Sequence, residues 1–284
     1  MERVTSLARP VRSAAVPARP SLAKLMADIE AMPSHPSVPL RILWLADDPR
    51  SSSSDLAKAV ELDPALTARL LRMSNSAYYS LRTPVTNVSR AITVLGFSTV
   101  RSMAAAATAG LDDGSELPAG FWDHAAATAN ATQLVAPRYM VPGGDGFALG
   151  LLHDLGTALL CRADPEQWEI ISANGENPEA EREVYGLTHP EVAARIFEVW
   201  RFSPEFTNAV ARHHWRLTAR EEPMTRCLIV GETIAAIAFE QLDEEALAEA
   251  HETLQAEGFQ PEHVARIAAR VVEEAASLAA ALES

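Results

Sequence analysis

The sequence has few aromatic residues, few glycines and almost no cysteine. Aromatic side chains make up 6% of the 284 residues, and there are 13 glycines and two cysteines. Runs that alternate β-branched and polar residues, which are typical of strands, are also scarce. Alanine and leucine are abundant instead, and both favour helices. With 48% apolar residues available for a sizeable core, the composition predicts an all-α protein.

A long apolar run and an excess of positive charge are also missing. Every stretch of about 18 residues contains a charge or a helix breaker, which argues against a membrane-spanning helix. The net charge of -14 opposes binding to nucleic acid. Residues 1–20 hold four arginines and three prolines but no compact apolar stretch. They indicate a flexible basic tail rather than a secretory signal, with a transit peptide as the weaker alternative. We therefore expect a cytoplasmic protein.

The two cysteines, Cys161 and Cys227, are far apart and both lie in apolar helical patterns. No CxxC motif accompanies them. This pattern favours two buried free thiols in a reducing compartment over a disulfide or a thiolate metal site.

Prolines, glycines and helix-capping residues divide the first half of the chain into short helices. Helices are expected over 21–32, 37–47 and 55–63, and Asp63-Pro64 is a strong start signal for another that continues through Tyr79. Gly96 ends a further helix, and the next one runs to about residue 110. The segment 111–120 is the clearest linker. It separates an N-terminal lobe, residues 21–116, from a C-terminal lobe, residues 117–284.

The C-terminal lobe is also expected to be helical throughout. A long helix over 121–140 precedes a turn at 142–146 and an apolar helix over 147–160. A capping box from Thr188 to Glu191 opens another helix, and Ser203-Pro204 opens one that reaches His213. Two or three amphipathic helices follow from about residue 225. Those over 244–284 either pack on the fold or, if a broad apolar face is exposed, form a homodimer.

Histidines form the most informative pattern in the sequence. One or two of them lie in each of several expected helices, and a helical bundle can bring such positions around one cavity. The adjacent His153-Asp154 stands out because a charge inside an apolar helix needs a partner. Mixed imidazole and carboxylate sites suit Fe, Mn, Zn or Mg, whereas a lone histidine is more often a core residue. The positions concerned are His124, His153, Asp154, His189, His213 and His214.

In this order, these residues resemble the metal-binding residues of the HD-domain phosphohydrolases, particularly the HD-GYP branch that hydrolyses cyclic di-GMP. The Gly-Tyr-Pro segment is missing, because WRLTAREEP follows His213-His214. The family also places an Asp on the next helix, where this chain offers Glu232. The resemblance implies a divalent metal site of one or two ions, with Glu232 as a further ligand. If the chain is active, Asp154 is the catalytic candidate.

The N-terminal lobe resembles the HDOD family of bacterial signalling domains. Asp63-Pro64, Asn75-Ser76, Leu95-Gly96 and Val100-Arg101 carry the resemblance, which continues through GLLHDLG and ARHH and covers about residues 30–215. HDOD domains share the HD fold but have no established enzymatic activity. Asn75 itself is expected to have a structural role, for example in capping a neighbouring helix.

Three functions follow from these patterns. We favour a non-catalytic signalling module that binds a protein partner or a small nucleotide, without a nucleic-acid or membrane partner. The alternatives are a metal-dependent phosphohydrolase and a metal or redox sensor. Arg101 and Arg212 could meet a phosphate near the histidines, although solvated or ion-paired arginines are the commoner case. Trp122 and Trp200 are expected in the core or a cavity wall rather than as base-stacking platforms.

Overall fold

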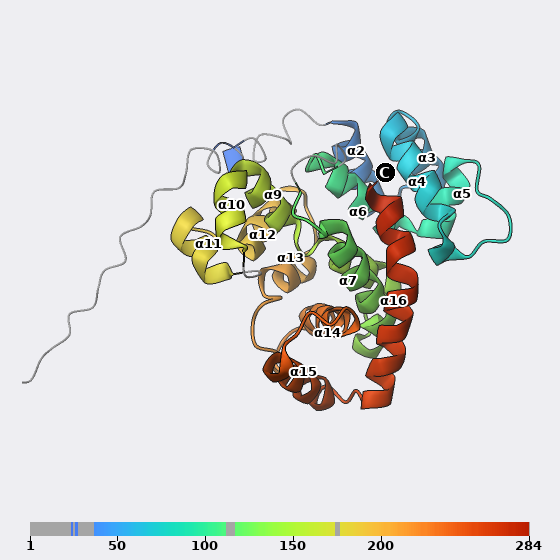
Figure 1. Cartoon of the computed structure of the whole chain (residues 1–284). Helices are drawn as coiled ribbons and strands as arrows, with labels where there is room; N and C mark the ends of the chain where they lie inside the picture. The colour runs from blue at the N-terminus through green and yellow to red at the C-terminus, as the bar shows by residue number, and fades with distance from the viewer. Residues whose placement is uncertain (1–23, 25, 28–36, 112–116, 174–176, 284) are drawn as a thin grey trace, which may run out of the picture.

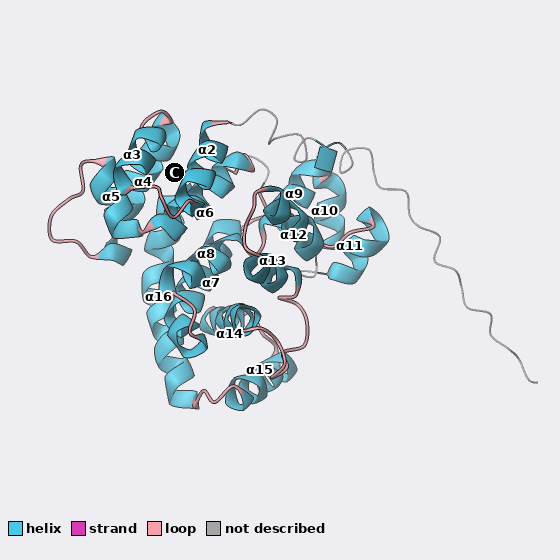
Figure 2. Cartoon of the chain, turned by 180° about the vertical axis from the view of Figure 1, so that it is seen from behind, coloured by secondary structure: helices cyan, strands magenta, loops and turns pink. Residues whose placement is uncertain are grey.

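Every regular element of the described chain is helical, as Figure 1 and Figure 2 show. The computed structural model describes residues 24, 26–27, 37–111, 117–173 and 177–283. No strand occurs among these residues, so the all-α prediction is confirmed. The expected basic tail and most of the expected helix over 21–32 lie outside the described residues.

The N-terminal lobe contains short helices whose starts follow local capping signals. Ser52 and Asp55 form a reciprocal capping box at the start of α3. Asp63 accepts a hydrogen bond from Leu66 N at 3.0 Å, and Pro64 opens α4. Gly96, with φ of 81°, makes the sharp turn between α5 and α6. The helices of this lobe are α2 (Val38–Asp47), α3 (Ser53–Val60), α4 (Pro64–Ser74), α5 (Val88–Leu95) and α6 (Phe97–Thr108), with a 3₁₀ turn, η2 (Ala77–Tyr79).

The helix expected to continue to Tyr79 ends at Ser74, so that boundary prediction is wrong. The Asn75 side chain explains the early end. Its amide donates to Leu71 O and Val85 O, both at 2.8 Å, and its oxygen accepts from Val85 N at 2.7 Å. Asn75 therefore closes α4 and fixes the following loop, which is the structural role expected of it.

The C-terminal lobe surrounds α7, which packs on α8, α14 and α16 (Figure 2). Its helices are α7 (Phe121–Val135), α8 (Gly143–Leu152), α9 (Leu155–Ala163), α10 (Pro165–Ile171), α11 (Pro178–Tyr185), α12 (His189–Val199), α13 (Pro204–Ala211), α14 (Pro223–Ala238), α15 (Glu244–Ala256) and α16 (Pro261–Glu283), with a 3₁₀ turn, η3 (Ala136–Tyr139).

Two predictions fail around α8. The expected turn at 142–146 is mostly helix, because α8 begins at Gly143. Glycine serves close packing here: a Cβ on Gly150 would lie 2.5 Å from Thr128 O in α7. The single helix expected over 147–160 is two helices, α8 and α9, which meet at His153-Asp154. The HD doublet thus lies at a helix junction, not in a helix interior.

Helix α16 joins the two lobes. It runs along α7 and reaches α4 and η2, so the C-terminus lies beside the N-terminal lobe (Figure 1). Val271 and Leu278 on this helix are fully buried. One continuous hydrophobic cluster includes Leu43, Phe147 and Leu278. The division into lobes at residue 116 stays a prediction.

Among the described residues, no single helix combines the length and hydropathy that crossing a membrane requires, and α5 and α6 do so only as a pair bent by 108°.

Candidate metal centre

The structure brings all seven predicted ligands to one place between the helices of the C-terminal lobe. Most of them lie at helix ends, where the backbone can direct a side chain inward. His124 lies in the first turn of α7 and Glu232 in the middle of α14. The others lie at the α8–α9 junction, at the first residue of α12 and just after α13: His153, Asp154, His189, His213 and His214.

Asp154 is the centre of this arrangement. Its two carboxylate oxygens face two different pairs of imidazoles. Oδ2 lies 3.3 Å from the Nε2 atoms of both His124 and His153. Oδ1 lies 3.4 Å from His213 Nε2 and 3.6 Å from His189 Nε2. Asp154 is 3% exposed, and its Oδ1 has no hydrogen-bond partner among the described residues.

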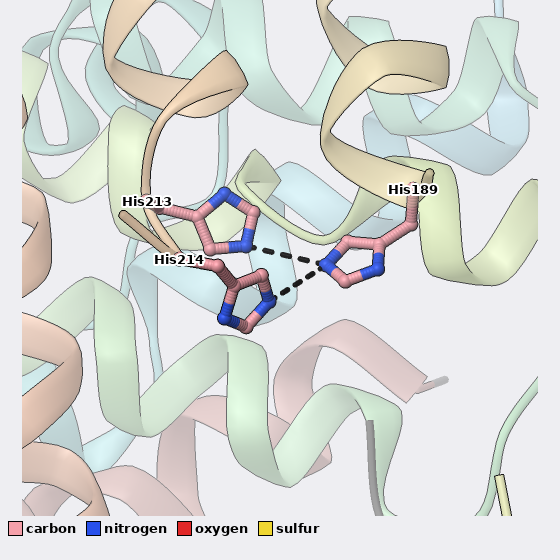
Figure 3. Close-up of side chains that lie close together, drawn as sticks. All are labelled: His189, His213 and His214. Atoms are coloured by element: carbon pink, nitrogen blue, oxygen red, sulfur yellow. Dashed lines mark hydrogen bonds between the residues drawn. The ribbon is translucent and has the colours of Figure 1, made fainter. Parts of the chain in front are cut away.

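One ligand group consists of His189, His213 and His214 (Figure 3). The Nε2 of His189 points between the other two rings, 2.9 Å from His214 Nε2 and 3.3 Å from His213 Nε2. Asp154 Oδ1 lies beside two of these atoms, those of His189 and His213. Each short contact is a hydrogen bond if one of the two rings carries its proton on Nε2, and the same spacing suits ligands that share one ion.

The second group consists of His124, His153 and Glu232, whose donor atoms lie within 4.8 Å of one another. The Nε2 atoms of its two histidines are 3.1 Å apart. Asp154 Oδ2 lies beside its two histidines, and Asp154 also forms a third group with His153 and His213. The structure therefore contains overlapping donor groups around a single carboxylate.

The buried imidazoles are oriented by oxygen acceptors on their outer nitrogens. His153 Nδ1 donates to Gly150 O at 2.8 Å, and His213 Nδ1 donates to Val210 O at 2.7 Å. In the neutral ring, an Nδ1 that carries the proton leaves the lone pair on Nε2, which faces the centre of the cluster. This is the tautomer that a metal ligand needs.

Glu181 orients the third buried imidazole, and the sequence reasoning missed it. Its Oε1 lies 2.8 Å from His189 Nδ1, and its Oε2 accepts from the backbone N of the same residue at 2.7 Å. The side chain of Glu181 is 1% exposed. It therefore caps the start of α12 and fixes the ring of His189. A nearby capping bond from Thr188 N to Glu191 Oε2 at 2.9 Å supports the same turn.

Burial and the Asp154 charge compete in setting the pKa values of the cluster. Burial lowers the pKa of His213. Burial also acts on His153, but the charge of Asp154 outweighs it and raises the pKa of that imidazole to about 10. Burial alone would raise the pKa of Asp154, yet the surrounding histidines, His153 foremost, hold it well below its usual range. The cluster is thus built around an ionised carboxylate.

This donor set fits a divalent metal. Donor atoms held about 2.1 Å from one ion lie roughly 3.0 Å apart at octahedral angles and roughly 3.4 Å apart at tetrahedral angles. The histidine–histidine and histidine–Asp154 contacts given above have similar lengths, from 2.9 to 3.6 Å, and the donor atoms of each three-residue group lie within 4.8 Å of one another. Imidazole with carboxylate suits Zn, Fe or Mn better than Mg, which prefers oxygen. Oδ1 of Asp154 is buried and has no hydrogen-bond partner among the described residues, so it is the clearest candidate for a bond to a metal ion.

The arginines considered for phosphate binding are engaged elsewhere. Arg101 pairs with Asp47 at 2.6 Å and donates to Arg201 O. Arg212 pairs with Glu221 at 3.3 Å. The ion-paired alternative was therefore the right one for both. Trp122 and Trp200 are buried in the core, as expected.

A cavity of about 880 Å³ opens onto one side of the cluster. His124, Asp154 and Glu232 lie in its wall, so it reaches the second ligand group. The remaining wall comes from the start of α7, from α9 and α10, and from the end of α14. Trp168 in α10 is part of this wall, and the sequence reasoning had given it no role.

Known proteins with this fold carry several descriptions. A candidate phosphohydrolase from Shewanella amazonensis SB2B has a TM-score of 0.70 at 22% identity, covering 92% of this chain and 98% of its own. A candidate signal transduction protein from Marinobacter aquaeolei VT8 has a TM-score of 0.68 at 22% identity, covering 93% and 65%. An HDOD domain protein of unknown function from Geobacter sulfurreducens has a TM-score of 0.62 at 17% identity, covering 93% and 98%.

Among curated sequences, an uncharacterised protein from Treponema pallidum (strain Nichols) is 25% identical over 213 residues. The match covers 71% of this chain but only 41% of that relative. The family model for the HDOD domain matches residues 32–215, more than half of the chain. That range includes helices α2 to α6 and every cluster histidine. The chain belongs to the HDOD domain family.

Proposed function

We propose that this chain is a signalling module that binds one or two divalent ions and uses them to hold its helices together around a ligand cavity. One observation carries the proposal: the two carboxylate oxygens of Asp154 face histidines of different ligand groups. Ions at these positions would connect α7, α9, α12 and α14. A partner protein or a small ligand would then be bound by the module.

Binding is favoured over catalysis by the number of protein donors. Each group supplies three side chains, and Asp154 lies within 3.6 Å of two imidazoles of each, so each ion would have up to four protein donors. Structural zinc sites have four protein ligands, whereas catalytic ones keep an open position for water or substrate. In a four-coordinate site the protein alone would saturate the ion.

Elemental analysis of the purified chain, followed by calorimetric titration with Zn²⁺ and Mn²⁺, tests the proposal. We expect binding in the micromolar range or tighter, with at least a tenfold loss in Asp154→Asn. Asp164→Asn, which changes an acid at the start of α10, is the matched control and should bind as the native chain does. A chain that binds no divalent ion at millimolar concentration contradicts the proposal.

A metal-dependent phosphohydrolase is the second candidate. Ions that prefer six ligands, such as Mn²⁺ or Fe²⁺, would retain open positions beside the cavity, and bound ions can activate water and polarise a phosphate. The Shewanella relatives described as candidate phosphohydrolases support this alternative. Hydrolysis of cyclic di-GMP or of a generic phosphodiester by the Mn²⁺-loaded chain, lost in Asp154→Asn, would establish it.

A further inference from the structure

The walls of the 880 Å³ cavity have an unusual charge for a site beside a metal centre. Of the described residues that line it, none is a lysine or an arginine. Four carboxylates line it, and two of them, Asp154 and Glu232, belong to the metal ligands. The other two, Asp123 and Glu169, lie outside both ligand groups. We refer to Asp123 and Glu169 as the outer carboxylates.

The outer carboxylates have no ion-pair partner among the described residues, and both are exposed. Bound ions would not reverse the local charge. Two divalent ions carry four positive charges, and the four carboxylates of the wall balance them: Asp123, Asp154, Glu169 and Glu232. A multiply charged phosphate ligand would therefore enter a cavity with no cationic side chain in its described wall.

Apolar groups complete the wall. Phe121, Trp168 and Phe239 contribute aromatic rings, and Ala127 and Ala235 contribute small side chains. Aromatic surface near carboxylates suits ligands with an apolar body and a positive group, because the ring face and the carboxylate both attract a cation.

A buried hydroxyl in the same wall has no partner. Thr157 lines the cavity and is 5% exposed, and its Oγ1 makes no hydrogen bond within the described chain. A buried polar atom without a partner is costly, on the order of 1–3 kcal/mol. The hydroxyl is therefore a ready donor or acceptor for a molecule in the cavity, independently of the acidic residues.

We propose that this cavity binds a small organic cation with an aromatic or apolar body, and that it discriminates against phosphate-bearing ligands. The inference deepens the proposed function because it gives the ligand class of the signalling module. The cationic group lies toward the outer carboxylates, the apolar body contacts Trp168 and Phe121, and the Thr157 hydroxyl bonds a polar atom of the ligand.

Three probes of similar shape and different charge test the proposal: 2-phenylethylamine, which is cationic, 2-phenylethanol, which is neutral, and phenylacetate, which is anionic. Each is titrated calorimetrically into the full chain, both metal-free and Zn²⁺-loaded, alongside cyclic di-GMP. We expect the amine to bind about tenfold more tightly than the alcohol, and phenylacetate and cyclic di-GMP to bind more weakly still.

Variants locate the effect. The double variant Asp123→Asn/Glu169→Gln should lose the preference for the amine while still binding the alcohol. A matched double variant on α15, Glu244→Gln/Glu245→Gln, removes the same charge away from the cavity and should keep the preference. Thr157→Val should weaken both the amine and the alcohol about threefold or more.

Tighter binding of phenylacetate or cyclic di-GMP than of the amine overturns the inference. So does the absence of binding by any probe at millimolar concentration. The metal titration described above tests the proposed function independently of these ligand titrations. Cation preference in a chain that binds no metal would overturn only the metal proposal, whereas metal binding without cation preference would overturn only this one.

Discussion

Glu181 shows how one residue can join local structure to a candidate metal centre. One oxygen caps the backbone at the start of α12, and the other holds the ring of the residue that begins the helix. Among 38 acidic residues, nothing in the sequence distinguishes it. Its role exists only where α11 meets α12, and it could not have been predicted from local pattern.

Replacing Glu181 should weaken metal binding without removing a ligand. Glu181→Gln keeps the size of the side chain but removes the charge that strengthens His189 as a donor. We expect a loss of about 10- to 100-fold in Zn²⁺ affinity, measured by competition with a chelating dye. Glu183→Gln, an exposed neighbour on the same helix, is the control and should bind Zn²⁺ normally. Equal affinities in all three proteins would show that Glu181 has no influence on the site.

Cys227 offers a prediction about alkaline pH. Burial raises the pKa of its thiol to about 12, whereas an unfolded thiol titrates near about 8.5. The folded pKa lies above the unfolded one, so the thiol's contribution to stability is complete below about pH 8.5. It is lost as the pH rises toward 12.

In urea titrations, the native chain should lose about 2 kcal/mol of unfolding free energy from this group between pH 7 and pH 10. Cys227→Ala should remove that part of the pH dependence, and Cys161→Ala should retain it. The same slope in the native chain and in Cys227→Ala would contradict the prediction.

At the scale of helices, the sequence predicted well those helix starts that depend on residues a few positions apart. The starts of α4, α12 and α13 follow from adjacent residues that cap a helix and open its first turn. The positions that failed depend on distant partners. The glycines at the start of α8 indicated a turn because glycine usually breaks helices, yet one of them, Gly146, allows α7 to approach closely: a Cβ there would lie 3.1 Å from Thr132 O.

The break at the HD doublet has the same kind of cause. A Cβ on Gly156 would lie 2.0 Å from His189 O, so α9 presses directly on the start of α12. That contact places His153-Asp154 beside His189, the candidate metal ligand at the start of α12. The histidines were predictable as a group from their residue types and order. That the two oxygens of Asp154 face different ligand groups was not predictable, because it depends on how these helices pack.

Gly156→Ala should therefore destabilise the chain and disturb the cluster. The new methyl group meets backbone rather than a flexible side chain, so we expect a loss of about 2–3 kcal/mol in unfolding free energy. Metal affinity should fall as well. Gly143→Ala, where a Cβ would find ordinary contact 3.7 Å from Gln133, is the control and should change stability little. Similar stabilities for both variants would argue against close contact between α9 and α12.

For the whole molecule, α16 packs against helices from both halves of the chain, and α6 connects the same halves through its contact with α8. The sequence left open whether these last helices pack on the fold or associate with another chain. In the structure, α16 packs along α7 and α14 and extends to α4. Its apolar stripe is used within the chain, and Leu278 is fully buried in the cluster shared with the first lobe.

Leu278→Ala should cost about 2–5 kcal/mol of unfolding free energy, because it leaves a cavity where the two lobes meet. Val272→Ala on the same helix removes a side chain that is 48% exposed, and should change stability by less than about 0.5 kcal/mol. Thermal and urea unfolding of both variants provide the measurement. A mild effect at Leu278 would indicate that α16 is only loosely docked.

The position of α16 also affects the order of events during synthesis. Among the helices over residues 38–108, α6 packs on α8, but α4 is covered in part by α16, at the other end of the described chain. A nascent polypeptide emerging from the ribosome would expose that surface until translation reaches the final helix. Such late closure favours recruitment of chaperones and makes premature termination a route to aggregation.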